Sequence, residues 1–129
     1  MRRRRKYGNR KVEADGQIFD SAREYRRWLD LDAMQDAGLI DDLRRQVKYI
    51  LIPEQRQIST ELYTRGPKKG TLKPGRVLER ECFYIADFVY TDIATGEEIV
   101  EDTKGVRTKD YIIKRKLMLK EYGIQIHEV

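Results

Sequence analysis

Three residues in the second half of the chain have the types and spacing of a metal-binding site. Asp102 and Lys104 are two positions apart, so in an extended strand their side chains point to the same face. Asp87 lies within the largely apolar run 84–90, where a charge is costly unless it is paired or binds a cation. Convergent carboxylates suit Mg²⁺, which is bound by one or two carboxylates and keeps several water ligands.

A hairpin between these residues would decide how they face one another. Residues 94–97, Ala-Thr-Gly-Glu, suit a turn between two strands. With that turn, residues whose numbers sum to about 191 lie opposite each other. This register places Asp87 across from Lys104, with Asp102 one pleat away. The alternative is a simple salt bridge between Lys104 and either aspartate, and a D-x-K tripeptide taken alone favours that alternative.

The rest of the sequence predicts helices and strands that would position this hairpin. Ser21 and Glu24 fit a capping box at the start of a helix that Gly38 ends. Thr108 and Gly123 suit the two ends of a second helix. Its predicted apolar face consists of Ile112, Ile113, Leu117, Met118 and Leu119.

These signals predict a single α/β domain with a central mixed β-sheet flanked by helices. The predicted elements, in chain order, are a small hairpin at 12–19, a helix at about 21–37, a strand at 46–53, a partner strand near 57–63, a mobile basic loop at about 64–76, strands at about 77–91 and 98–104, a helix at about 108–122 and a closing strand at 124–129.

Charge is arranged in blocks along the chain, whose formal net charge is +5. Residues 1–11 carry seven basic side chains and no acidic one, and we expect them to form a flexible arm. Residues 65–80 hold six basic and one acidic residue, residues 81–103 none and seven, and residues 104–120 seven and one. Such blocks suit a protein that holds a polyanion at its edges and concentrates carboxylates at one point. The alternative is a disordered basic tail beside ordinary charged surfaces.

Composition excludes several classes of protein. With 129 residues the chain is suited to one domain, 12–129, behind the arm. No apolar stretch is long enough to span a membrane, and no apolar segment follows the basic N-terminus, so we expect a soluble cytoplasmic protein. Cys82 and His127, the only cysteine and histidine, cannot form an internal disulfide or a Cys/His zinc site. A metal would therefore be held by oxygen ligands.

The spacing of these residues resembles the PD-(D/E)XK nuclease superfamily. Asp87 is followed after 14 residues by Asp102-Thr103-Lys104, and Glu24 lies on an upstream helix. Ala86 stands where the motif has proline, and Asp102 is the shorter of the two allowed acids. More narrowly, four segments are similar to small phage-encoded endonucleases related to Holliday-junction resolvases: Phe19-Asp20-Ser21, Gly38-Leu39-Ile40, Tyr84-Ile85-Ala86-Asp87-Phe88 and Tyr122-Gly123-Ile124.

The resemblance implies a restriction-endonuclease-like core and a metal-dependent endodeoxyribonuclease. Asp87 and Asp102 would be metal ligands, the Thr103 carbonyl a further ligand, and Glu24 would complete the metal shell, although as a capping-box residue it could serve the helix start alone. Lys104 would orient or activate the attacking water. Mg²⁺ would be the cofactor, with Mn²⁺ able to replace it.

The implied substrate is DNA, preferably branched or four-way-junction DNA processed during phage recombination. The products would carry 5′-phosphates, the enzyme would be a homodimer, and it would act in the cytoplasm of a bacterial host. Gln46 could touch a water or the scissile phosphate, but it is more ordinarily a polar residue at a strand end. The basic residues expected to contact phosphates are Arg3, Arg4, Lys68, Lys69, Lys73, Lys114 and Lys116.

Two other functions fit the same sequence. A nucleic-acid-binding protein without catalysis would bind DNA with a steep salt dependence and need no metal. A nick, mismatch or restriction-type endonuclease of the same superfamily would differ from a resolvase in substrate preference alone.

Overall fold

The computed structural model describes residues 10–104 and 106–129. The predicted contacts Arg3 and Arg4 therefore lie outside the described residues. Ten elements follow one another along the chain: β1 (Val12–Ala14), β2 (Gln17–Phe19), α1 (Ala22–Asp36), β3 (Ile40–Ile52), β4 (Gln55–Arg56), β5 (Val77–Glu79), β6 (Cys82–Asp92), β7 (Glu98–Asp102), α2 (Lys109–Tyr122) and β8 (His127–Glu128). Within the described ranges, no helix is long and apolar enough to cross a bilayer.

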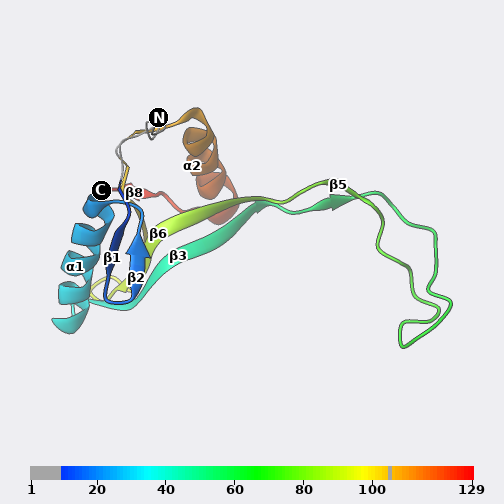
Figure 1. Ribbon diagram of the computed structural model, residues 1–129, viewed down its shortest axis with the longest axis horizontal. Coiled ribbons are helices and arrows are strands. Elements are labelled where there is room, and N and C mark those ends of the chain that lie inside the picture. Colours follow the sequence, from blue (N-terminus) through cyan, green and yellow to red (C-terminus); the bar gives the residue numbers. More distant parts are fainter. Residues whose placement is uncertain (1–9, 105) are drawn as a thin grey trace, which may run out of the picture.

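The body of the molecule is built on a mixed four-stranded sheet, which confirms the predicted α/β fold. Its strand order is β3-β6-β7-β8, with β8 parallel to β7 and the other pairs antiparallel. Phe88 and Tyr90 of β6 pack with Leu31 of α1, whereas Val89 between them packs with Met118 of α2. From Phe88 to Tyr90, successive residues therefore face different helices, whereas Tyr84 and Ala86 belong to the apolar layer of α2. Figure 1 shows the two helices on different sides of these strands.

Both helices begin at the residues that the sequence predicts. Ser21 caps α1 by accepting a hydrogen bond from the Glu24 amide, and Thr108 caps α2 by accepting one from the Tyr111 amide. Gly123, with a φ of 66°, ends α2 in the left-handed conformation that glycine adopts without strain. The predicted apolar face of α2 is wrong in part: its buried residues are Tyr111 and Met118, whereas Ile113 and Leu119 are more than half exposed.

Strand β3 is longer than predicted and forms an arm together with β6. It begins at Ile40 instead of residue 46, and its pairing with β6 shifts register between Asp41 and Arg44. Asp42 adopts a φ of 53° within this irregular segment, so the strand continues across a bulge at two adjacent acidic residues. Figure 1 shows the two strands running side by side out of the body and leading through β4 and β5 into a distant loop.

Three further strand predictions are corrected by the structure. The partner of β3 is β6, so the predicted strand near 57–63 is wrong; the short pair β4–β5 lies outside it. The predicted strand at 77–91 is divided into β5 and β6, with a break at 80–81. The predicted strand at 98–104 ends at Asp102, so Thr103 and Lys104 follow the strand.

Candidate metal centre

A pocket of about 390 Å³ lies where the start of α1 meets the middle of β6 and the end of β7. It contains all four residues predicted to be catalytic. Its lining consists of Asp20, Ser21, Glu24, Gln46, Ile85, Asp87, Asp102, Thr103 and Lys104.

Asp87 faces Asp102, not Lys104. Phe88 pairs with Glu101, so the next position along β6 and β7 places Asp87 opposite Asp102. The predicted register is thus wrong by two residues, while its consequence, two carboxylates and a lysine in one pocket, is present. Thr103 holds Asp87 in place: its amide nitrogen and its hydroxyl lie 2.8 Å and 2.9 Å from Asp87 Oδ2.

Asp102 is buried, and its surroundings disfavour the charged form of its carboxyl group. Its side chain is 3% exposed, and its Oδ2 accepts a hydrogen bond from the Tyr84 hydroxyl at 2.5 Å. Burial, followed by the neighbouring charge of Asp87, raises the pKa of Asp102 to about 7. Lys104 Nζ lies 3.4 Å from Asp102 Oδ1 and 4.4 Å from the centroid of the Tyr111 ring. The salt bridge considered as the alternative is therefore formed, inside the same pocket.

Glu24 points into the pocket from the first turn of α1, but both of its oxygens already have donors. Oε1 accepts hydrogen bonds from Arg45 at 3.2 Å and Gln46 at 3.0 Å, and Oε2 accepts one from the Asp20 amide at 3.1 Å. Burial, followed by the charge of Asp87, raises the pKa of Glu24. These contacts suit Glu24 to a place in the outer shell of a cation held by the aspartates.

Gln46 takes an uncommon backbone conformation beside the site. Its neighbours Arg45 and Val47 pair with Phe88 and Ala86, so Gln46 lies opposite Asp87 on the adjoining strand. Its φ is 53°, a region that costs energy for a residue with a side chain. The conformation accompanies the hydrogen bond from its side-chain nitrogen to Glu24. Gln46 therefore lies inside β3 and helps to fix Glu24.

The chemistry of these groups fits one hard divalent cation. Asp87 and Asp102 are two opposed carboxylates whose oxygens could serve as ligands, and among the described residues Asp102 forms an ion pair with one lysine, Lys104, at 3.4 Å. In the part of the chain that is described, no three Asp, Glu, His or Cys side chains are placed to hold a metal together. Two carboxylates with water completing the shell is the arrangement that Mg²⁺ accepts, so the pair fits Mg²⁺ without Glu24 as a direct ligand.

Residues 4–127 match a family model described as a protein of unknown function, DUF1064. The match covers nearly the whole chain. The chain belongs to the DUF1064 family. No curated protein and no solved structure matches the chain. The description of the DUF1064 family assigns no activity to its members.

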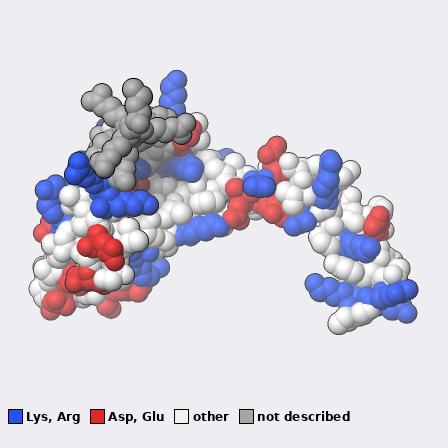
Figure 2. Space-filling view, in the orientation of Figure 1, with Lys and Arg blue, Asp and Glu red and all other residues white. Residues whose placement is uncertain are grey.

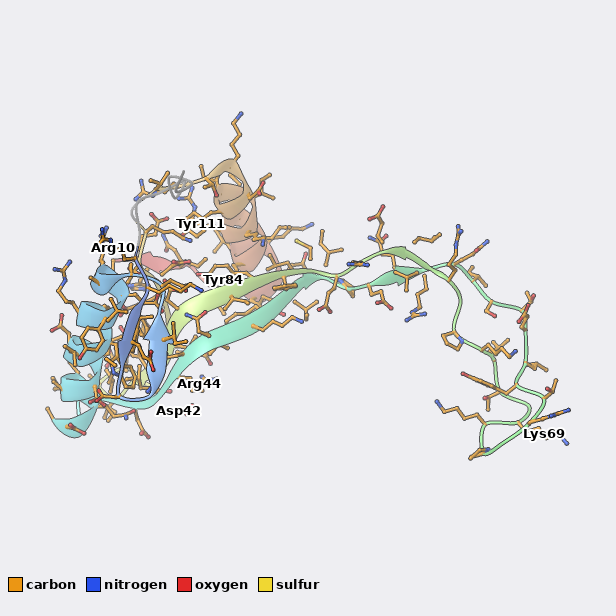
Figure 3. The ribbon with its side chains drawn as sticks, viewed as in Figure 1. Arg10, Asp42, Arg44, Lys69, Tyr84 and Tyr111 are labelled. Atoms are coloured by element: carbon orange, nitrogen blue, oxygen red, sulfur yellow. The ribbon has the colours of Figure 1, made fainter. Side chains whose placement is uncertain are left out.

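The predicted phosphate contacts lie in two separate places. Lys114 and Lys116 are on α2; Lys114 lies 5.7 Å from the Phe83 ring centroid, and Lys116 is exposed. Lys68, Lys69 and Lys73 are in the loop at the end of the arm. Figure 3 shows Lys69 there, far from Tyr84 beside the pocket.

Sequence reasoning did not find two residues that hold the carboxylates. Tyr84 bonds Asp102, and Arg45 bonds Glu24 while its guanidinium lies 3.8 Å from the Phe19 ring centroid. Both contacts join elements that are separated along the chain, Tyr84 to Asp102 between β6 and β7 and Arg45 to Glu24 between β3 and α1, so neither has a local spacing. Tyr84 is two residues before Ala86 and four before Phe88. This spacing predicts only that its side chain lies on a buried face of the strand.

In EDTA, the metal-free protein is expected to lose stability as pH rises from about 5 to 8. The pKa of Asp102 is about 7 in the folded protein and 3.8 ordinarily, so between these values the folded state binds more protons than the unfolded state and the free energy of unfolding falls. The loss begins at about pH 4, is complete by about pH 8, one unit above the folded pKa, and amounts to a few kcal/mol at most. Thermal unfolding across this pH range measures it.

Asp102→Asn should flatten this pH dependence, whereas Asp30→Asn, a change at an exposed position of α1, should preserve it. Adding Mg²⁺ at pH 8 should raise the wild-type melting temperature, because a ligand of the folded state stabilises it by mass action. An equal pH dependence in wild type and Asp102→Asn would show that another group is responsible.

Proposed function

We propose that the chain is a Mg²⁺-dependent endonuclease that hydrolyses phosphodiester bonds in DNA. The observation that carries the proposal is the opposition of Asp87 and Asp102 in one polar pocket with Lys104. A structural salt bridge needs one carboxylate, whereas here burial, followed by the charge of a second carboxylate, raises the pKa of the first. A buried carboxylate whose charge is disfavoured in this way is typical of a site that binds a cation.

The chain's own residues would divide the work as follows. Thr103 fixes one oxygen of Asp87, and Tyr84 fixes one oxygen of Asp102, so the two carboxylates are held before any ligand arrives. Mg²⁺ bound there would supply Lewis-acid stabilisation of the phosphate charge and a more acidic water. Lys104, held between Asp102 and the Tyr111 ring, would orient the attacking water or neutralise charge in the transition state.

Basic side chains near the pocket support DNA as the substrate. Arg23 of α1 donates a hydrogen bond to the Lys104 carbonyl at 3.0 Å, which places an exposed guanidinium at the pocket. Lys114 and Lys116 lie on α2, and Figure 2 shows further basic side chains over the body and the arm. Contacts of this kind hold the nucleic-acid backbone without reading bases. We therefore favour DNA recognised by its shape, such as a branched or four-way junction, cut by a cytoplasmic homodimer.

The test is cleavage of matched four-way-junction, flap, nicked and linear DNAs in Mg²⁺, Mn²⁺ or EDTA. We expect cutting with either metal, none in EDTA, and 5′-phosphate ends. Lys104→Met should lower the rate by about 10²-fold, the scale of a lost transition-state contact, and still bind DNA. Cutting that survives EDTA would contradict the proposal.

One alternative is a DNA-binding protein without catalysis, and the ion pair that Lys104 forms with Asp102 favours it. This alternative predicts that every DNA substrate is bound and that none is cut with any metal. A preference for nicked or linear DNA in the same assay, or for a mismatched duplex added to it, would instead identify another nuclease of the type that the motif resembles.

A further inference from the structure

The paired strands β3 and β6 extend beyond the body as an arm whose outer part, residues 53–81, carries β4, β5 and the loop between them. Figure 1 shows this outer part standing clear of both helices. In the sheet topology β4 and β5 pair with each other and with no strand of the body. Ordering an extension of this kind costs conformational entropy and buries little surface. Contacts between the arm and another molecule would explain why the chain has it.

The end of the arm is an organised hairpin. Leu62 and Leu72 form an isolated antiparallel bridge. The Tyr63 amide donates to the Thr71 carbonyl at 2.9 Å, and the Gly70 amide donates to the Tyr63 carbonyl at 2.9 Å. Gly66 and Gly70 have φ values of 80° and 84°, which only glycine adopts without strain. The loop predicted at 64–76 therefore presents its side chains from a defined backbone.

The side chains at this end carry one sign of charge. Residues 62–76, called here the arm tip, contain five basic residues and no acidic one. Among the ion pairs of the described residues, none involves Arg65, Lys68 or Lys69. Figure 2 shows basic side chains gathered at the far end of the arm, and Figure 3 shows Lys69 there.

The positive charge of the arm tip favours a polyanion, and not a second copy of the chain, as the molecule that the tip binds. Two arm tips brought together would place ten positive charges, five from each tip, in one contact, which is unfavourable. Of the exposed apolar residues of the arm, Leu62 and Leu72 pair with each other and Ile58 precedes Leu62 by four positions, and small exposed apolar groups are common on monomers. Phosphates of a nucleic acid match the charge of the arm tip.

We propose that the arm tip binds the phosphate backbone of duplex DNA at a second place, remote from the segment that enters the pocket. Lys69 in the arm tip is 23 residues beyond Gln46 at the pocket, and this length of extended chain spans at most about 76 Å, about the length of 22 base pairs. The proposal rests on the proposed function for its ligand, and it adds a dependence on substrate length: a duplex of more than about 22 base pairs is long enough to reach both the pocket and the tip.

The test measures binding without cleavage, in EDTA, by fluorescence anisotropy on hairpin-capped duplexes of about 8 and about 30 base pairs, the shorter being below one helical turn. Lys68→Ala/Lys69→Ala removes two charges from the tip. Arg26→Ala/Lys120→Ala is the matched control, since both residues are exposed, on α1 and α2. Binding in EDTA does not depend on the metal chemistry, so failure here and failure of the nuclease assay are separate results.

On the long duplex, the tip variant should bind about tenfold more weakly than wild type, and its slope of log K against log[salt] should be smaller in magnitude by about 1.8, two contacts at about 0.9 each. On the short duplex the tip variant should equal wild type, and the control variant should equal wild type on both. An equal loss on both duplexes, or no loss on the long one, would overturn the proposal. So would a wild-type dimer that the tip variant dissociates without changing its salt slope, since the arm would then bind a second copy.

Discussion

Asp102→Asn is expected to reduce DNA cleavage by about 10³-fold or more, while the protein remains folded and still binds DNA. The amide is as large as the carboxylate and can still accept the hydrogen bond from the Tyr84 hydroxyl. It removes the charge that opposes Asp87, so a divalent cation loses one of its two anionic ligands. A loss of this size is that of a missing electrostatic stabiliser of the transition state.

The measurement compares single-turnover cleavage by wild type and Asp102→Asn in Mg²⁺, with binding and thermal unfolding of each protein measured in EDTA. The metal-free variant should be at least as stable as wild type at pH 8, because an unfavourable buried charge is gone. Asp30→Asn, an exposed change on α1, should cut normally. If Asp102→Asn cuts at the wild-type rate, the metal site has been assigned to the wrong residues.

Local sequence patterns located the site because its parts lie in strongly patterned segments. The period of two in a strand correctly separates Glu101, which bonds Arg27, from Asp102, which bonds Tyr84. The capping signal places Glu24 at the third position of α1, where it enters the pocket. These are short-range relations that few neighbouring residues determine.

Register was predicted incorrectly because one side chain moves the turn. Asp92 accepts a hydrogen bond from the Ala94 amide through its carboxylate, and its own amide donates to the Glu97 carbonyl at 2.8 Å. The turn therefore starts at Asp92, and Thr91 pairs with Glu98. Turn residues can be recognised in a sequence, but a shift of one position on each strand changes every opposed pair.

Strand partners were harder to predict than strands. The run after Pro53 has residues suited to a hairpin with β3, yet β6, 30 residues further along the chain from β3's end, pairs with β3 along most of its length. The pairing is decided by apolar residues such as Val47 and Ala86 that pack on α2, and such long-range packing leaves no spacing in the sequence. The arm and its remote tip follow from that pairing.

Arg27→Ala is expected to lower the free energy of unfolding by about 3 kcal/mol, the lower end of the cost of breaking a buried ion pair. Arg27 Nε and Nη2 each lie 2.7 Å from an oxygen of Glu101. The Glu101 side chain is 2% exposed and the Arg27 side chain 25%, so water screens the pair only from the arginine side. Without Arg27, the hydrogen bond from Tyr90 is the one that this buried carboxylate keeps among the described residues. Urea unfolding in EDTA measures the change.

Adding Glu101→Gln to Arg27→Ala should restore about half of the lost stability, because the unpaired buried charge is then removed while Tyr90 keeps an acceptor. Arg26→Ala, the exposed neighbour, should change stability by about 0.5 kcal/mol or less. A loss below about 1 kcal/mol for Arg27→Ala would mean that solvent screens the pair, as at a surface. Glu101 directly precedes Asp102, and Arg27 lies one turn after Glu24 on α1. This ion pair therefore connects the helix that carries Glu24 to the strand that carries Asp102. The double variant Arg27→Ala/Glu101→Gln should cut DNA more slowly than wild type even under conditions in which it is fully folded.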